Sequence, residues 1–129
     1  MLQIRYSPPN EVDISGSPKD LHDFKNQLLD FLRSSAKDFS IETDAKVNPA
    51  PYLKVIPKLQ FSKTDSPTKI SILSDAILSV EGSVENLDKF SSWFNFPLDA
   101  KHGAHGHYDW FEGNKYVDKN SLPIVVGVL

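Results

Sequence analysis

The feature that most constrains this chain is an internal repeat. The pair Gly16-Ser17 recurs as Gly82-Ser83, 66 positions later, and 66 is close to half of the 129 residues. The same shift also aligns apolar positions and a proline: Ile4 with Ile70, Val12 with Leu78, Ile14 with Val80, Leu21 with Leu87, Phe24 with Phe90, Leu28 with Phe94, and Pro57 with Pro123. Two copies are too few for a solenoid. The repeat therefore predicts a pseudo-symmetric pair of units, residues 1–63 and 67–129, within one domain.

Each unit shows the same order of predicted elements, two strands, a helix and two strands. Short apolar segments that alternate with polar residues are typical of half-buried strands. The expected strands are 2–6, 11–15, 38–43 and 53–61 in the first unit, and 68–73, 76–81, 104–110 and 122–128 in the second. This order predicts an α+β fold made of two ββαββ units, with one or two antiparallel sheets and both helices covering one face.

The two predicted helices have clear start signals. Ser17 is a favourable N-cap, Pro18 suits the first helical position, and Asp20 completes a capping-box-like spacing. Ser83 takes the same place in the second unit. The apolar stripes that follow are Leu21, Phe24, Leu28, Phe31 and Leu32 in the first helix, and Leu87, Phe90, Trp93 and Phe94 in the second, which Pro97 is expected to end.

The composition limits the possible partners. The net charge is −3 and the acidic residues are scattered, which argues against nucleic-acid binding, since that usually requires a strongly basic surface. No apolar run approaches the roughly 20 residues that span a bilayer, and the first residues lack the pattern of a signal peptide. The absence of cysteine is compatible with a reducing compartment. We expect a cytoplasmic protein with no nucleic acid or membrane as a partner, whose oligomeric state the sequence leaves open.

A histidine-rich segment is the first candidate for chemistry. On a strand, His105, His107 and Asp109 would share one face, and His102 lies close by. Three such ligands and a water form the usual catalytic zinc site. However, the pattern is short, and the repeat aligns His105 and His107 with Phe39 and Ile41, which favours a packed or partly covered face. We therefore expect no metal cofactor and keep a metal-dependent enzyme or metal-binding protein as the alternative.

Motifs for other enzyme classes are missing from the sequence. It contains no G-x-S-x-G elbow, no cysteine nucleophile and no glycine-rich phosphate loop. The two Gly-Ser helix starts are better explained as caps than as anion sites, because both units have one. The sequence thus predicts no catalytic residues and a protein that is not an enzyme.

An aromatic and acidic segment near the C-terminus is the second candidate. Aromatic side chains beside acids are typical of protein-binding surfaces, although strands also favour aromatic residues for packing alone. The residues expected to contact a partner are Tyr108, Asp109, Trp110, Glu112, Tyr116 and Asp118, with Phe111 beside them.

These motifs also carry a resemblance. The segments 14–21, 104–113 and 116–126 combine a Gly-Ser-Pro helix start, an H-x-H-Y strand, a glycine turn and a closing S-L-P-I-V-V strand. In this combination the chain resembles small bacterial immunity proteins of polymorphic toxin systems, whereas residues 36–75 show no such match. The resemblance implies an intracellular protein that binds and neutralises a cognate toxin without catalysis. A further alternative is a module that self-associates through an unpaired terminal strand.

Overall fold

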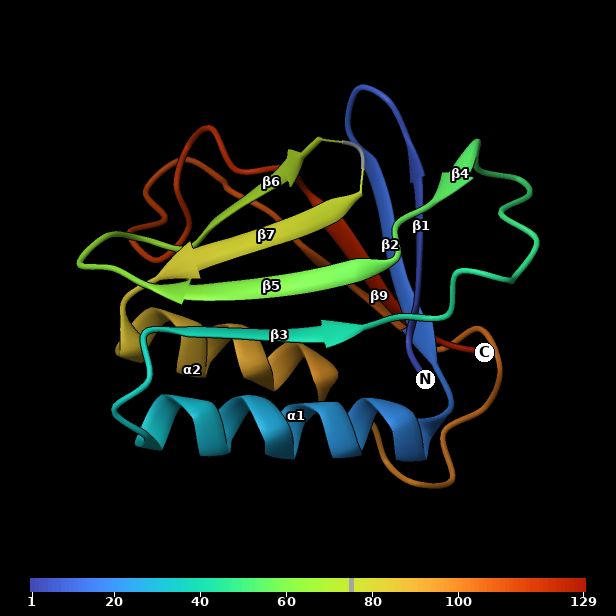
Figure 1. Cartoon of the computed structure of the whole chain (residues 1–129), viewed down its shortest axis with the longest axis horizontal. Coiled ribbons are helices and arrows are strands. Elements are labelled where there is room, and N and C mark those ends of the chain that lie inside the picture. The colour runs from blue at the N-terminus through green and yellow to red at the C-terminus, as the bar shows by residue number, and fades with distance from the viewer. Residues whose placement is uncertain (75) are drawn as a thin grey trace.

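The computed structural model describes residues 1–74 and 76–129. Within them the chain forms two mixed sheets and two α-helices, which confirms the α+β class. Sheet A has the order β4-β1-β2-β9-β8 and sheet B the order β3-β5-β7-β6 (Figure 1). The strands are β1 (Gln3–Ser7), β2 (Glu11–Gly16), β3 (Asp38–Glu42), β4 (Lys54–Val55), β5 (Lys58–Lys63), β6 (Lys69–Leu73), β7 (Ile77–Gly82), β8 (His105–Tyr108) and β9 (Ile124–Val128).

The two repeat units exchange strands. The first hairpin of one unit, β1–β2, pairs with the last two strands of the other, β9 and β8, and the hairpin β6–β7 pairs in the same way with β5 and β3. Within a unit the pairs are antiparallel, but β2 pairs with β9 and β5 with β7 in parallel. The expectation of antiparallel sheets is therefore wrong for the two strand pairs that connect the units, β2–β9 and β5–β7. Sequence spacing predicts hairpins, but it does not reveal which hairpins meet.

Each sheet contains one row of inward-facing residues, and the two rows are equivalent in the repeat. Sheet A has the row Ile4, Ile14, Val126, Gly106, and sheet B has the row Ile70, Val80, Phe61, Phe39. The shift between equivalent residues is 66 for the hairpin, from Ile14 to Val80, but 67 from Phe39 to Gly106 and 65 from Phe61 to Val126. The ungapped alignment is consequently off by one residue in the later strands, and a one-residue shift reverses the face of every side chain.

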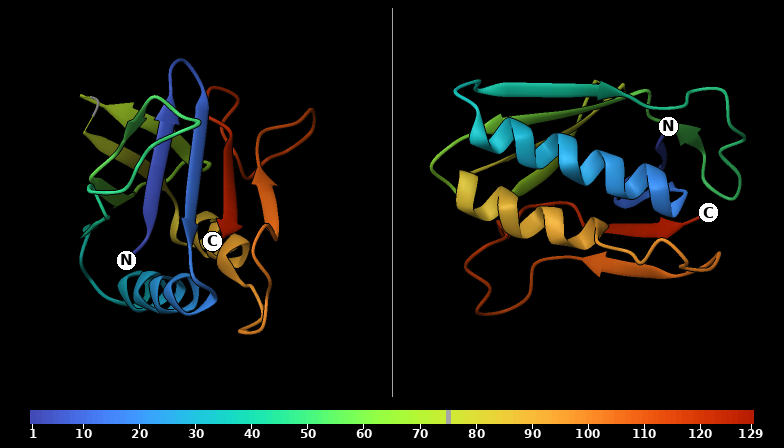
Figure 2. Two further views of the ribbon diagram at one scale, coloured as in Figure 1. Left: turned by 90° about the vertical axis from the view of Figure 1, so that its right-hand side faces the viewer. Right: turned by 90° about the horizontal axis from the view of Figure 1, so that it is seen from below.

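The helices lie side by side along one side of the sheets, with β3 flanking α1 and β8 flanking α2 (Figure 2). Helix α1 spans Pro18–Arg33, and α2 spans only Val84–Ser91 before the 3-10 turn η1 (Ser92–Phe94). Both are capped as expected, since Ser17 Oγ accepts a hydrogen bond from Asp20 N at 3.0 Å and Ser83 Oγ accepts one from Asn86 N at 3.1 Å. None of the described helices is both long and apolar enough to cross a membrane.

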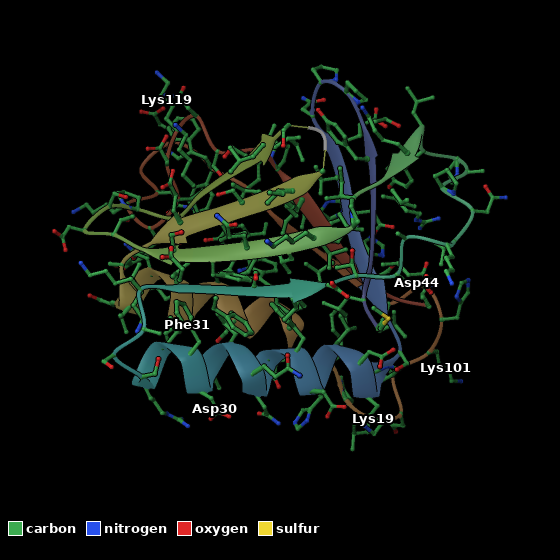
Figure 3. All side chains as sticks on the ribbon, viewed as in Figure 1. Lys19, Asp30, Phe31, Asp44, Lys101 and Lys119 are labelled. Atoms are coloured by element: carbon green, nitrogen blue, oxygen red, sulfur yellow. The ribbon has the colours of Figure 1, made fainter. Side chains whose placement is uncertain are left out.

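The core lies where the helix pair meets both sheets. Phe61 of β5 is fully buried and touches Phe24 of α1 and Phe90 of α2, with ring centroids 5.8 Å apart in each pair. Phe31 points from α1 toward the sheet and stacks on Phe39 at 5.3 Å (Figure 3). Residues of both units thus share one hydrophobic cluster.

The predicted strand 53–61 divides into β4 and β5 at Ile56-Pro57, where the chain passes from sheet A to sheet B. Ile56 is fully buried there, and its carbonyl accepts a hydrogen bond from the Thr43 hydroxyl. The first strand, β1, lies between β4 and β2, and the last strand, β9, lies between β2 and β8. Both terminal strands therefore have neighbours on each side, which removes the basis for self-association through an unpaired terminal strand.

Candidate protein-binding site

Strand β8 presents its histidines to solvent and its tyrosine to the core. His105 and His107 are exposed, whereas Tyr108 is only 4% exposed. The interpretation of the histidine face as packed or partly covered is wrong, because the inward equivalents of Phe39 and Ile41 are Gly106 and Tyr108. The register shift of one residue accounts for the error.

Tyr108 belongs to the core rather than to the exposed surface. Its ring makes edge-on contacts with Phe90 at 5.0 Å and Trp93 at 5.5 Å. Burial raises the pKa of the Tyr108 hydroxyl, and the neighbouring Thr68 hydroxyl partly offsets this rise. Among the described residues the Tyr108 hydroxyl has no hydrogen-bond partner of good geometry. Tyr108, one of the residues expected to contact a partner, is therefore buried beneath the exposed residues of the site.

The histidines do not assemble a metal site. The rings of His105 and His107 lie 5.2 Å apart on the same face of β8, and His105 Nδ1 is 2.9 Å from the carbonyl of Gly103. His102 lies in the exposed loop that precedes β8. In the described part of the chain, no three His, Cys, Asp or Glu side chains come together in a group that would hold a metal ion. The candidate set of His102, His105, His107 and Asp109 is therefore not gathered around one point.

Beside β8 lies a recess of about 380 Å³, here called the aromatic groove. It is bounded by the end of α2, by η1, by β8 and by the loop that follows β8. Its lining residues are Lys89, Trp93, His107, Tyr108, Asp109, Trp110, Phe111, Asn114, Tyr116 and Val117. Three of its aromatic side chains reach solvent, with Trp93 38%, Tyr116 49% and Phe111 65% exposed. Exposed aromatic residues gathered around one recess are the usual anchor points of protein interfaces.

Local interactions hold the groove in shape. Trp93 packs over Gly106, where an added Cβ would come within 3.2 Å of its ring, so the glycine makes room for the tryptophan. The far wall is tied to sheet B, because Thr68 N donates to the Tyr116 carbonyl and Asp118 N donates to the Thr68 carbonyl, both at 2.8 Å. The Lys89 ammonium lies 4.5 Å from the centroid of the Tyr116 ring. The groove is therefore formed before any partner binds.

The structure brings together four of the six residues expected to contact a partner, Tyr108, Asp109, Trp110 and Tyr116. The other two lie outside the lining. Glu112 is exposed next to Gly113, whose φ of +88° marks the turn, and Asp118 accepts a hydrogen bond from Asn120 N at 2.7 Å.

Sequence reasoning missed Lys89 and Trp93, which come from the other side of the groove. The apolar spacing predicts Trp93 in the buried stripe of the second helix, but α2 ends at Ser91 and Trp93 lies in η1. The only local signal of this early end is the pair Ser91-Ser92, and two serines are too weak a signal to place a helix end.

The repeat provides an internal comparison for the aromatic groove. A second recess lies at the equivalent place in the first unit, lined by Met1, Leu2, Asp20, Asp23, Phe24, Gln27, Ile41 and Glu42. Shifts of 66 and 67 place Gln27 where Trp93 lies and Glu42 where Asp109 lies. We call this second recess the polar groove. Since the fold tolerates glutamine at the position equivalent to Trp93, the tryptophan is not needed to build the fold.

A third recess, of about 280 Å³, lies on the outer face of sheet A and is here called the carboxylate recess. It shares His107 and Asp109 with the aromatic groove, and its other lining residues are Asn10, Glu11, Val12, Tyr52, Pro123, Ile124 and Val125. Burial raises the pKa of Tyr52, and the negative charges of Asp13 and Glu11 raise it further against the opposing effect of Arg5. Two exposed carboxylates, Glu11 and Asp109, line the recess, so its walls carry negative charge.

Comparison with protein-family models, with curated proteins and with solved structures finds no match for this chain.

Proposed function

We propose that this protein is a bacterial immunity protein, which binds a cognate toxin in the cytoplasm and neutralises it without chemistry of its own. The observation that carries the proposal is the aromatic groove. Its three exposed rings line one recess, and Gln27 takes the place of one of them, Trp93, in the other repeat unit. The fold therefore does not require an aromatic ring at that position, and binding of a partner explains the exposed rings best.

The physical properties of the groove suit a protein ligand. Large rigid side chains such as Trp93, Phe111 and Tyr116 bury much apolar area while losing little conformational entropy on binding. Asp109 lies at the edge of the groove, where charge steers association more than it adds affinity. The resemblance of the same segment to immunity proteins supports the proposal from the sequence.

The test compares two double variants that change matched grooves. Phe111→Ala with Tyr116→Ala removes exposed rings from the aromatic groove, and Gln27→Ala with Glu42→Ala changes the polar groove. The probe is a protein encoded beside this chain that passes one criterion, namely that its expression alone arrests bacterial growth, and binding is measured by calorimetry. Loss of hot-spot aromatic residues typically costs about 2 kcal/mol or more, so we expect roughly 30-fold weaker binding for the first variant.

The control variant is expected to bind within about twofold of the unchanged protein, since its groove lies in the other repeat unit. Equal weakening by both variants would assign binding to another surface. A neighbouring toxic protein that neither binds nor is neutralised would contradict the proposed function itself.

A further inference from the structure

The aromatic groove and the carboxylate recess are neighbours on one surface. His107 and Asp109 line both, so these two residues of one strand and its extension form the ridge between them. A partner that fills the aromatic groove would therefore reach the carboxylate recess without leaving the surface.

The carboxylate recess has acidic walls and an apolar floor. The apolar floor is formed by Pro123 and Val125, which line the recess and are half-buried. The register across β2, β9 and β8 aligns Val12, Ile124 and Tyr108, which face the core, so that Glu11, Pro123 and Asp109, each one position further along, lie side by side on the outer face. Neighbouring strands are about 4.8 Å apart, which places the backbones of Glu11 and Asp109 about 10 Å apart on either side of Pro123. Glu11 and Asp109 are both exposed, and among the described residues no ion pair neutralises either.

This combination fits a guanidinium group better than an ammonium group. A guanidinium is planar, donates hydrogen bonds from its edges and packs its weakly hydrated faces against apolar or aromatic groups. Between Glu11 and Asp109 its edges would meet carboxylates, while Pro123 offers an apolar surface to one of its faces. An ammonium group is compact and strongly hydrated, so it would gain less from such a floor.

The same face of sheet A already binds one guanidinium from within the chain. Arg5 donates to Asp13 Oδ2 from Nη2 at 2.5 Å and from Nε at 3.2 Å, and its Cζ lies 5.1 Å from the centroid of the Tyr52 ring. Because Arg5 neutralises Asp13, the carboxylates of Glu11 and Asp109 give the recess its net negative charge. The Asp13 carboxylate thus binds the edge of the Arg5 guanidinium and the Tyr52 ring packs against its face, next to the recess.

We propose that an arginine side chain of the protein partner docks in the carboxylate recess between Glu11 and Asp109, next to apolar residues of the partner in the aromatic groove. This inference rests on the proposed function and names the chemistry of the partner: a basic surface whose arginine is adjacent to apolar side chains. Charge complementarity and the continuity of the two recesses support it.

Selection from random linear peptides displayed on phage tests the inference without the natural partner. Peptides are selected on the unchanged protein and counter-selected on Glu11→Gln with Asp109→Asn. Both substitutions keep the side-chain shape, and the amide introduced by Asp109→Asn retains an oxygen that can accept from Trp110 N. The matched control is Asp38→Asn with Glu42→Gln, which removes two charges from the exposed strand β3. Binding of the selected peptides is then measured with their arginine replaced by citrulline, a neutral group of the same shape.

We expect the selected peptides to combine arginine with aromatic or aliphatic residues. Their affinity should fall about tenfold or more on the Glu11→Gln, Asp109→Asn variant and on citrulline replacement, because charge-assisted hydrogen bonds are lost. The control variant should bind within about twofold of the unchanged protein. Selected peptides without arginine, unchanged binding to the double variant, or no selection above the double variant would each overturn the inference. Because the toxin experiment leaves Glu11 and Asp109 unchanged, either test can fail without the other.

Discussion

Separate replacement of His107 and Tyr108 by alanine tests the register of β8, on which the description of the site depends. These neighbours point to opposite faces of sheet A. His107 is exposed, and its removal should change the free energy of unfolding by no more than about 0.5 kcal/mol. Tyr108 is 4% exposed and contacts the rings of Phe90 and Trp93, so its removal leaves a cavity in the core.

The size of the Tyr108→Ala effect follows from its contacts. Truncation of a buried aromatic residue to alanine typically costs about 3 to 5 kcal/mol, to which each favourable ring pair contributes about 0.5 to 1.5 kcal/mol. Removing a buried hydroxyl that lacks a good partner offsets part of this loss. We therefore expect a loss of about 3 kcal/mol, a large fraction of the roughly 5 to 15 kcal/mol that stabilises a typical domain.

Urea unfolding followed by circular dichroism measures both variants, with an unchanged slope showing that the midpoint alone has moved. A His107→Ala variant that loses as much stability as Tyr108→Ala would contradict this register of β8. A loss below about 1 kcal/mol for Tyr108→Ala would have the same meaning. The first result would place His107 in the core, as the ungapped repeat alignment predicts, and the second would place Tyr108 outside it.

Further predictions concern the core, the caps and the response to alkaline pH. Phe61→Ala should cost about 3 to 5 kcal/mol and the equivalent Val126→Ala about 2 kcal/mol in urea unfolding, because more buried volume is removed at Phe61; equal losses would contradict the packing described. Ser17→Ala and Ser83→Ala should each cost about 1 kcal/mol in the same assay, since each removes an N-cap hydrogen bond, and a loss at only one site would show that the caps are not equivalent. Folding raises the pKa of Tyr108, so its contribution to stability is fully present below the unfolded value of about 10 and is lost as the pH rises through the folded value. Tyr108→Phe should therefore lose less stability than the unchanged protein above about pH 10, and parallel pH profiles would argue against this origin.

Much of the fold is predictable because its signals are local. Ser17 and Ser83 mark helix starts through cap chemistry that involves only the next few residues, and apolar residues alternate in β2 and β7 because every second side chain points into the core. The exchange of strands is not predictable in this way, since it depends on which hairpins meet after long separations in the chain. The register of β8 was not predicted because compensating shifts of 67 and 65 leave the average spacing of the repeat at 66.

Only the residues that follow β8 in the aromatic groove could be predicted from the sequence. Asp109, Trp110 and Tyr116 are close in sequence, and their composition alone indicates a surface for binding. The spacing of Trp93 continues the apolar stripe of the second helix and so predicts a core position, but the helix ends before it and Gly106 leaves room for its ring. Glu11 gives no signal, because only the parallel pairing of β2 with β9 brings it near Asp109.

Growth rescue by matched variants tests directly whether the aromatic groove binds the toxin. The toxic neighbouring protein is expressed together with the unchanged chain, with Phe111→Ala and Tyr116→Ala in the aromatic groove, or with Gln27→Ala and Glu42→Ala in the polar groove, and folding of each variant is verified by urea unfolding. We expect the unchanged chain and the polar-groove variant to restore growth, and we expect no growth with the folded aromatic-groove variant. Full rescue by the aromatic-groove variant would contradict the claim that this groove binds the toxin.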